Sequence, residues 1–311
     1  MNENLTAYLL FMGCSAIACV LWFFLSFRRG AESGKAAALS GLILLLGAVL
    51  GLLGARLGWI LLRFNVVIAR PKDLLTLRYD ELSFWGGVAG VILAVFLAAK
   101  MMRQPAREVL NRFAPMGALM AAAARFAESF LGLFGVGFVQ AWYETGLFFP
   151  VTVEFVWDEY YSEFYLAVFM FSGIFCLIAM FLSLVHGKEE NRLVRTVFYL
   201  CLPQILFECM RMQAIKWLFV PLEQLVCFLF CEGVLAAYAF RARPKHLRSW
   251  LPAITGLLVC GVIIVCEFAL DGKITLGEEF IPQWITYGVM ALALAAMAVA
   301  EHRGNRRIQS A

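Results

Sequence analysis

The sequence predicts an all-α integral membrane protein, a polytopic bundle of about nine transmembrane helices, and three observations carry that prediction. Of the 311 residues, 62% are hydrophobic and 15% are charged, whereas soluble domains average roughly 45–50% and about 25%. Apolar runs recur that are long enough, as helices, to cross about 30 Å of hydrocarbon. The alternating ten-residue blocks of a membrane barrel are absent from the sequence. This composition excludes a soluble globular enzyme, a disordered chain and a nucleic-acid-binding protein.

Nine segments are expected to span the membrane. Six of them contain no charged residue, namely Thr6–Phe27, Ala36–Ala55, Leu82–Ala99, Phe164–Val185, Trp250–Cys266 and Phe280–Ala300. Three more are interrupted by charge or proline: Leu110–Leu131 with Arg125 and Glu128, Leu193–Phe207 with Pro203, and Trp217–Phe240 with Glu223 and Glu232.

The distribution of Lys and Arg predicts the orientation, because cytoplasmic loops carry an excess of both residues. With the N-terminus placed outside, 17 of the 26 fall in inside segments and seven outside, while Arg56 and Arg125 lie within helices. We therefore expect the N-terminus outside and the C-terminus inside. The nine cysteines show no CxxC spacing, so we expect them to pack as small apolar residues and expect neither a metal site nor a cofactor.

Charged residues kept inside spans indicate where function lies, because each costs at least a few kcal/mol unless it meets a polar cavity, partner or ligand. Arg125 and Glu128 are three residues apart, share a helix face and can pair; a purely structural ion pair is the alternative. Glu208 and Arg211 repeat that spacing. With Arg56, these residues are expected in the outer half of the bilayer, where the planar fork of arginine suits a phosphate.

A glycine-rich segment opens the third predicted span. Gly86 and Gly90 form a GxxxG face that lets another helix backbone approach closely. The alternative is that Gly86 and Gly87 allow backbone amides to approach a substrate.

The order of these features resembles a known family, the prolipoprotein diacylglyceryl transferases of bacterial inner membranes. Six segments carry the resemblance: Gly54-Ala55-Arg56-Leu57, Leu82–Val91, Ala114-Pro115 through Glu128, Tyr161–Tyr165, Glu208-Cys209-Met210-Arg211 and Pro221–Leu225. They are similar to the family's Ser-Phe-His-Gly-Gly, Gly-Arg-x-x-Asn, His-Pro-Ser-Gln-Leu-Tyr, Arg-x-x-x-Glu-x-x-Arg and related motifs. The resemblance implies a transferase-like membrane domain over residues 1–243 and an extension over 244–311 with two further helices.

Members of this family move diacylglycerol from phosphatidylglycerol to the thiol of a lipoprotein-signal cysteine. The resemblance therefore implies a multi-pass transferase of the bacterial plasma membrane, with phosphatidylglycerol and a prolipoprotein signal peptide as partners. Arg125 would hold the lipid phosphate as charge develops on the departing glycerol phosphate. The implied catalytic residues are Arg125, Glu128 and Glu208, and the implied substrate-binding residues are Arg56, Gly86, Gly87, Tyr165 and Arg211.

The sequence departs from the family pattern at several functional positions. Trp85 replaces the catalytic histidine, Gln204 the first arginine of the sixth-helix motif, Glu128 the asparagine, Ala124 the glycine, and Tyr160-Tyr161 the His-Pro pair. All three histidines fall in predicted inside segments, so a base for the thiol would have to be Glu128 or Glu208. Two other functions stay open: a non-catalytic paralogue that binds anionic phospholipid or lipoprotein signal helices, and a transporter, against which the lack of paired half-repeats argues.

Overall fold

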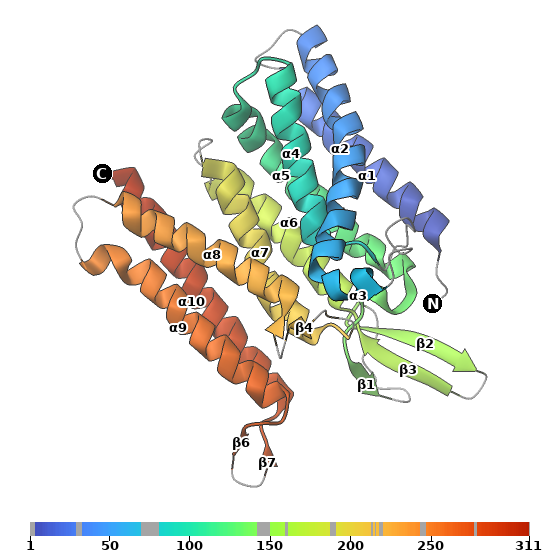
Figure 1. Ribbon diagram of the computed structural model, residues 1–311, viewed down its shortest axis with the longest axis vertical. Helices are drawn as coiled ribbons and strands as arrows, with labels where there is room; N and C mark the ends of the chain where they lie inside the picture. The colour runs from blue at the N-terminus through green and yellow to red at the C-terminus, as the bar shows by residue number, and fades with distance from the viewer. Residues whose placement is uncertain are drawn as a thin grey trace. The chain divides into compact units, whose positions relative to one another are not determined.

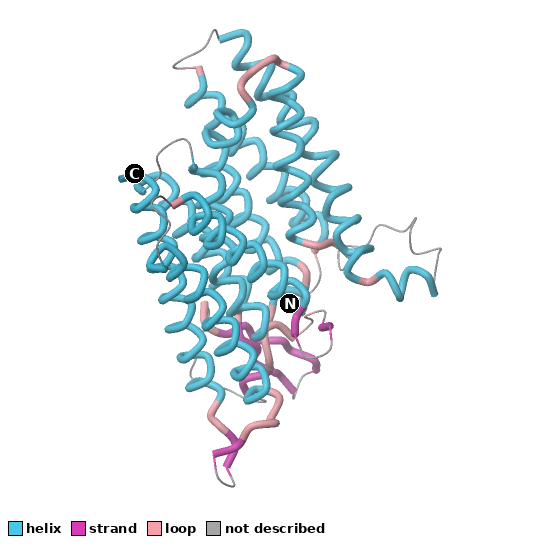
Figure 2. The backbone as a smooth tube through the Cα atoms, turned by 60° about the vertical axis from the view of Figure 1, so that its left-hand side comes forward, coloured by secondary structure: helices cyan, strands magenta, loops and turns pink. Residues whose placement is uncertain are grey.

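The computed structural model describes most of the chain as helix. The described residues are 4–28, 33–69, 81–141, 150–158, 161–186, 191–212, 214, 216–217, 220–242, 247–276 and 279–310. They form ten α-helices and a few short strands at helix ends (Figures 1 and 2). The chain divides into two compact units, residues 1–197 and 198–311, which are described separately below.

Eight helices of the described chain are long and apolar enough to cross a membrane. They are α1 (Leu5–Phe27), α2 (Ser33–Leu62), α4 (Phe84–Met101), α6 (Val168–His186), α7 (Arg192–Met210), α8 (Leu222–Arg241), α9 (Leu247–Leu270) and α10 (Gln283–Ser310). A ninth long helix, α5 (Ala106–Ala127), carries several charged residues and falls where the fourth span was predicted. The predicted class, an all-α multi-pass membrane protein, is confirmed, while the orientation stays a prediction.

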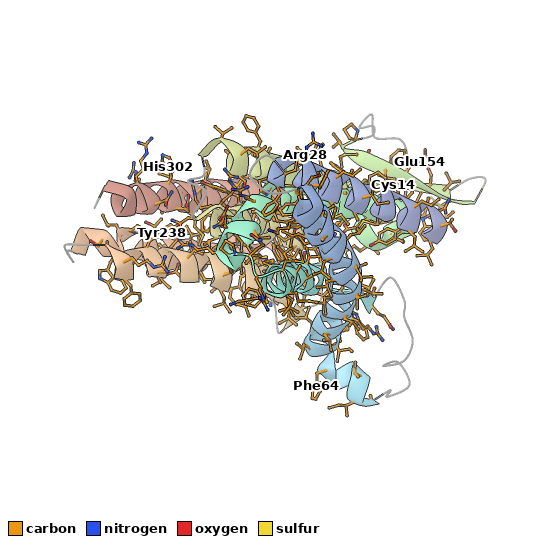
Figure 3. All side chains as sticks on the ribbon, turned by 90° about the horizontal axis from the view of Figure 1, so that it is seen from above. Cys14, Arg28, Phe64, Glu154, Tyr238 and His302 are labelled. Atoms are coloured by element: carbon orange, nitrogen blue, oxygen red, sulfur yellow. The ribbon has the colours of Figure 1, made fainter. Side chains whose placement is uncertain are left out.

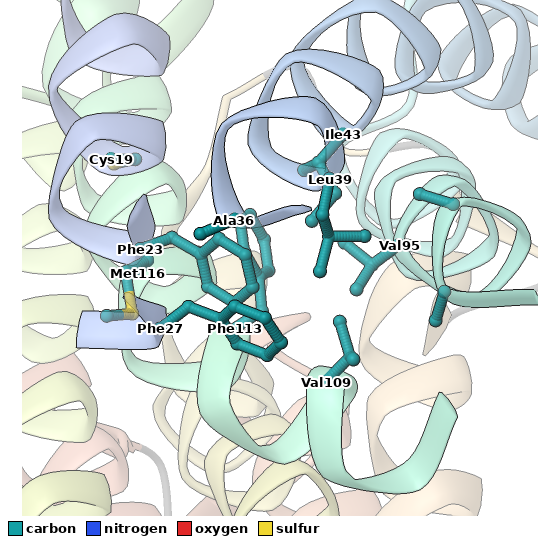
Figure 4. Close-up of a cluster of buried hydrophobic side chains, with 12 residues drawn as sticks. Cys19, Phe23, Phe27, Ala36, Leu39, Ile43, Val95, Val109, Phe113 and Met116 are labelled. Atoms are coloured by element: carbon teal, nitrogen blue, oxygen red, sulfur yellow. The ribbon is translucent and has the colours of Figure 1, made fainter. Parts of the chain in front are cut away.

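The first unit has an apolar core between α1, α2, α4 and α5 (Figure 4). Phe23 stacks on Phe27 with ring centroids 5.5 Å apart and meets Phe113 of α5 edge-on at 5.6 Å. Ala36 and Leu39 of α2 are fully buried in the same cluster. This packing fixes α5 against its neighbours and so positions the polar end of that helix.

Glycines let α2 and α4 pack with their backbones in contact (Figure 1). A Cβ atom at Gly86 would lie 2.3 Å from the Gly54 carbonyl oxygen, and one at Gly90 would lie 2.1 Å from that of Leu50. A Cβ at Gly87, by contrast, would lie 3.5 Å from Cβ of Ala55, an ordinary van der Waals contact. Close helix packing, one of the two interpretations of the GxxxG face, therefore accounts for glycine at positions 86 and 90.

A three-stranded antiparallel sheet follows α5, in the order β1 (Val139–Ala141), β3 (Tyr161–Leu166), β2 (Thr152–Asp158). Because β3 pairs along its whole length with β2, α6 begins only at Val168 rather than at Phe164, where the span was expected. A positive φ of 63° at Gly132 lies in the turn between α5 and this sheet.

The second unit contains most of α7 together with α8, α9 and α10. Two short ladders, β4–β5 (Lys216–Trp217 with Val220–Pro221) and β6–β7 (Thr275–Leu276 with Glu279–Phe280), precede α8 and α10. These pairings explain why both helices begin a few residues later than predicted. The family-based division at residue 243 differs from the unit boundary at 197 and stays a prediction.

Buried polar contacts link the helices of this second unit. The hydroxyls of Tyr199 and Tyr238 donate to the two carboxylate oxygens of Glu301, at 2.8 and 3.2 Å. Glu301 is fully buried on α10, and Tyr238 comes from α8 (Figure 3). The C-terminal helix is therefore held to α7 and α8 by hydrogen bonds as well as by apolar packing.

Candidate functional site

The C-terminal end of α5 carries a buried ion pair. Nη1 of Arg125 lies 2.6 Å from Oε1 of Glu128, so the pairing that the three-residue spacing predicted is formed. Arg125 is 0% exposed and Glu128 is 5% exposed. The ring of Phe84, at the start of α4, lies 3.8 Å from the Arg125 guanidinium carbon. A guanidinium held between a carboxylate and an aromatic face is fixed in place, and removing either charge of such a pair typically costs about 3–5 kcal/mol.

A glycine lies against the Glu128 side chain. A Cβ atom at Gly135 would lie 3.0 Å from Oε2 of Glu128 and 2.9 Å from Cβ of Phe169 on α6. Only glycine therefore fits between the turn after α5 and α6 without a shift of its neighbours. This close contact shapes the wall of the site on the Glu128 side.

The hydroxyl of Ser172 and Nε1 of Trp85 are among the buried polar atoms of the same unit that have no hydrogen-bond partner among the described residues. Ser172 lies one turn before Cys176, which is within electrostatic reach of both Arg125 and Glu128. Trp85 packs edge-on against Phe84, with ring centroids 5.2 Å apart. Buried donors of this kind usually have a hydrogen-bond acceptor in native proteins, so both groups are available to bind one.

Trp85 is placed by the first turn of α4. Ser83 caps this helix by accepting a hydrogen bond from the Gly86 amide at 3.3 Å, and its own amide donates to the Ala55 carbonyl of α2 at 2.9 Å. An indole N–H donates one hydrogen bond and cannot accept a proton. The side chain at position 85 can therefore bind an acceptor but cannot act as a base.

Arg56 of α2 is paired with a carboxylate that sequence reasoning missed. Its Nη1 lies 2.6 Å from Oε2 of Glu81 and 3.2 Å from the Glu81 carbonyl oxygen. The ring of Trp59 lies 4.7 Å from the guanidinium carbon. The two partners are 25 residues apart, so no local pattern could have paired them.

Tyr165, a predicted substrate-binding residue, belongs to a hydrogen-bonded cluster on β3. Glu163 accepts hydrogen bonds from Tyr161 at 2.6 Å, from the Trp157 indole at 2.9 Å, and from Tyr165. The bonds from Tyr161 and Tyr165 lower the pKa of Glu163. Burial and the bond to Glu163 raise the pKa of Tyr165 to about 12. The alternation of Tyr161, Glu163 and Tyr165, which places all three on one strand face, was the available sequence signal.

Glu208 and Arg211 lie at the end of α7, in the second unit. The Glu208 carboxylate is 3% exposed and accepts a hydrogen bond from Nε2 of Gln204 at 2.7 Å. Gln204 thus supplies a neutral amide donor at the position where the family resemblance leads one to expect arginine. The Arg211 backbone amide donates to the Glu208 carbonyl oxygen at 3.4 Å, at the helix end.

The predicted site residues therefore fall into separate groups. Arg125 and Glu128 are in contact; Arg56 contacts Glu81, and Gly86 contacts Gly54. In the part of the chain that the structure describes, no group of three or more His, Cys, Asp or Glu side chains is arranged to hold a metal ion. Of the positions considered in the sequence analysis, Tyr160 lies outside the described residues, and so does His246, one of the three histidines.

The fold and these sites define a class: a polytopic helical membrane protein with buried arginine–carboxylate pairs in its helical bundle. A comparison with curated proteins found no match. The family model of the prolipoprotein diacylglyceryl transferases matches residues 3–240, more than half of the chain. The protein belongs to the prolipoprotein diacylglyceryl transferase family.

Proposed function

We propose that the protein transfers diacylglycerol from phosphatidylglycerol to the thiol of a lipoprotein-signal cysteine, in the plasma membrane of a bacterium. The observation that carries the proposal is the Arg125–Glu128 pair, buried at the end of α5 within the matched family region. A buried guanidinium can hold a lipid phosphate with charge-assisted hydrogen bonds and stabilise the charge that develops on the departing glycerol phosphate.

The proposed role of Glu128 follows from competition for one guanidinium. Phosphate oxygens and carboxylate oxygens both bind the Arg125 fork, so a lipid phosphate that binds Arg125 displaces Glu128. The released carboxylate then accepts the thiol proton. The thiol sulfur forms a bond to the glyceryl carbon, the bond from that carbon to the phosphate oxygen breaks, and glycerol phosphate leaves with the electron pair. Because the Trp85 indole cannot accept a proton, a carboxylate is needed for this step.

The other residues in the proposal bind or orient the two substrates. Arg56 and Tyr165 line the lipid site, and Gly87 lets the lipid approach α4. Gly86, the other glycine that the resemblance implied, supports the site by holding α4 against α2. On the other unit, Glu208 is a second candidate base and Arg211 a second phosphate ligand. These assignments are supported by the family match alone.

A non-catalytic paralogue that binds anionic phospholipid is the second candidate function. The observation that favours it is Trp85, whose indole is a donor without basic character and whose Nε1 has no hydrogen-bond partner among the described residues. Such a side chain is suited to bind a phosphate or ester oxygen and to leave the substrate unreacted.

The test is lipid transfer by purified protein with phosphatidylglycerol and a signal peptide that contains the cysteine. We expect Arg125→Ala to reduce release of glycerol phosphate by about 10²-fold or more, as for loss of a group that binds transition-state charge. Arg112→Ala is the matched control, because Arg112 lies on the same helix and pairs with Glu108 at 2.7 Å, but at the opposite end and partly exposed. Its transfer rate should be unchanged.

Each part of the proposal has its own contradicting outcome. Transfer by Arg125→Ala at a rate close to that of the unmodified protein would reject the role of Arg125. Binding of phosphatidylglycerol that requires Arg125, without any transfer to the peptide, would reject the transferase function and favour the non-catalytic paralogue.

A further inference from the structure

A carboxyl group in the middle of α8 has no role in the proposed transfer. Glu232 is ten residues after Leu222 and nine before Arg241, the first and last residues of this helix. About 14 Å of helix therefore separates it from either end. Because α8 is long and apolar enough to cross a membrane, the carboxyl group falls near the middle of the hydrocarbon. An ionisable residue at this depth usually marks a functional site.

Glu232 packs against a glycine of α9, the next helix along the chain (Figure 1). A Cβ atom at Gly256 would overlap Oε2 of Glu232 and would lie 3.0 Å from its Cδ. The carboxyl group thus fills the space that a larger side chain at position 256 would need. Gly256 is itself buried, so Oε2 is enclosed between the two helices.

This oxygen has no polar partner in the described chain. Oε2 of Glu232 is buried and forms no hydrogen bond with any described residue. Among those residues, no Lys or Arg side chain contributes to the electrostatic environment of the carboxyl group. The titratable groups that face it are the thiols of Cys260 on α9 and Cys231 on α8, and the described residues of α7 and α10 add none. An ionised carboxylate would be unpaired here, which hydrocarbon strongly disfavours.

The outer side of the contact is apolar and exposed. Leu229, one turn before Glu232, is 60% exposed, and Leu257, next to Gly256, is 61% exposed. Glu232 itself is partly exposed. In a membrane such a surface faces lipid, so an apolar molecule can reach the carboxyl group from the hydrocarbon.

We propose that Glu232 and Gly256 form a proton-binding site within the membrane, at which Glu232 is a neutral carboxylic acid that is reached from the lipid. A proton needs only one oxygen ligand, whereas a Ca²⁺ or Mg²⁺ ion needs about six. Loss of the proton would leave an unpaired carboxylate against α9, so ionisation of Glu232 is coupled to the contact between α8 and α9. The site does not rest on the transferase proposal, because both residues lie outside the Arg125–Glu128 pair and the test measures no lipid transfer.

The test treats the full-length protein in detergent with dicyclohexylcarbodiimide, an apolar reagent, and maps the adducts by mass spectrometry. The acid proton moves to a carbodiimide nitrogen and the carboxyl oxygen bonds to the central carbon. The acyl group then migrates to nitrogen, so the whole reagent is added and nothing leaves. We expect a mass gain of one reagent molecule on the peptide that contains Glu232 at neutral pH. The yield should fall as the pH rises, because only the neutral acid supplies the proton.

Two controls separate this site from other carboxyl groups. Glu232→Gln should lose the adduct, whereas Glu301→Gln should keep it, because Glu301 is fully buried in the same unit and receives two tyrosine hydroxyls. A water-soluble, cationic carbodiimide should leave Glu232 unmodified while it reacts with Glu108, whose side chain is 48% exposed.

Three results would overturn the proposal. The first is a folded protein without an adduct at Glu232 at neutral pH, and the second is an equal yield at acidic and alkaline pH. The third is modification of Glu232 by the water-soluble reagent as fast as by the apolar one, which would place the carboxyl group in water. Because the adduct is mapped on the unmodified protein, these results stand even if Glu232→Gln fails to fold.

Discussion

Adjacent glycines on α4 give the sharpest test of the packing described for the first unit. We expect Gly86→Ala to destabilise the protein and Gly87→Ala to leave its stability unchanged or to raise it by up to about 1 kcal/mol through the better helix propensity of alanine. At position 86 the new Cβ would lie 2.3 Å from the Gly54 carbonyl oxygen, whereas at position 87 its closest contact is at 3.5 Å. The two substitutions add the same methyl group to neighbouring residues of one helix, so each controls for the other.

The magnitude follows from how far α2 and α4 must separate. To bring 2.3 Å to the shortest contact that real Cβ atoms show, about 3.0 Å, the helices must move apart by about 0.7 Å. Overpacking of this kind typically costs about 1–3 kcal/mol, and the better helix propensity of alanine returns up to about 1 kcal/mol. A net loss of about 1–2 kcal/mol corresponds to a fall in Tm of roughly 2–8 °C for a protein of this size.

Thiol accessibility gives a suitable assay. Seven of the nine free cysteines are buried, and only Cys14 is exposed (Figure 3), so a thiol-reactive dye reports unfolding over a small background. The reasoning would be refuted if Gly86→Ala unfolded at the Tm of the unmodified protein. It would equally fail if Gly87→Ala were as destabilising as Gly86→Ala.

Two further predictions concern polar contacts of the first unit. Glu163→Gln should lower the pKa of Tyr165 from about 12 towards 10, because the hydrogen bond and the charge of the carboxylate both raise this pKa, while burial keeps part of the shift. Ultraviolet titration, with Tyr165→Phe as the reference that identifies the Tyr165 signal, measures the change. An unchanged titration would contradict the hydrogen bond between Tyr165 and Glu163. Folding lowers the pKa of Glu163, so this carboxylate stabilises the folded protein at pH values above its unfolded-state pKa of about 4.5. That stabilisation is lost as the pH falls through the folded-state pKa. Glu163→Gln should therefore remove this loss from the acid side of a curve of Tm against pH. For the Arg56–Glu81 pair, Glu81→Leu alone should lower the free energy of unfolding by about 3–5 kcal/mol, because it leaves a buried cation without its carboxylate. Arg56→Met combined with Glu81→Leu should recover most of that loss. Thermal unfolding of the single and double variants measures the coupling energy, and additive losses would show that the two residues are not coupled.

The membrane helices could be predicted from the sequence because few backbone conformations are stable in the hydrocarbon of a membrane. A segment that crosses it must satisfy its hydrogen bonds internally, so length and apolarity suffice to identify it. The short ladders that precede α6, α8 and α10 lie at helix ends, where the sequence carries no comparable constraint. The expected starts at Phe164, Trp217 and Phe280 were therefore a few residues too early.

Among the polar residues, a contact between neighbours in the sequence could be predicted, whereas contacts between distant residues could not. The Arg125–Glu128 pair follows from helix periodicity and could be predicted from spacing alone. The contacts of Arg56 with Glu81 and of Gln224 with Glu267 join residues 25 and 43 positions apart. Such pairs depend on how helices pack against one another, which one sequence does not specify.

The central claim is transfer of diacylglycerol to a cysteine thiol, and mass spectrometry of the acceptor peptide tests it most directly. Purified protein is incubated with phosphatidylglycerol and a lipoprotein-signal peptide, in parallel with a peptide that has serine in place of the cysteine. The account predicts a mass gain of one diacylglyceryl group on the cysteine peptide and none on the serine peptide. An unmodified cysteine peptide, under conditions in which the protein binds phosphatidylglycerol, would contradict it.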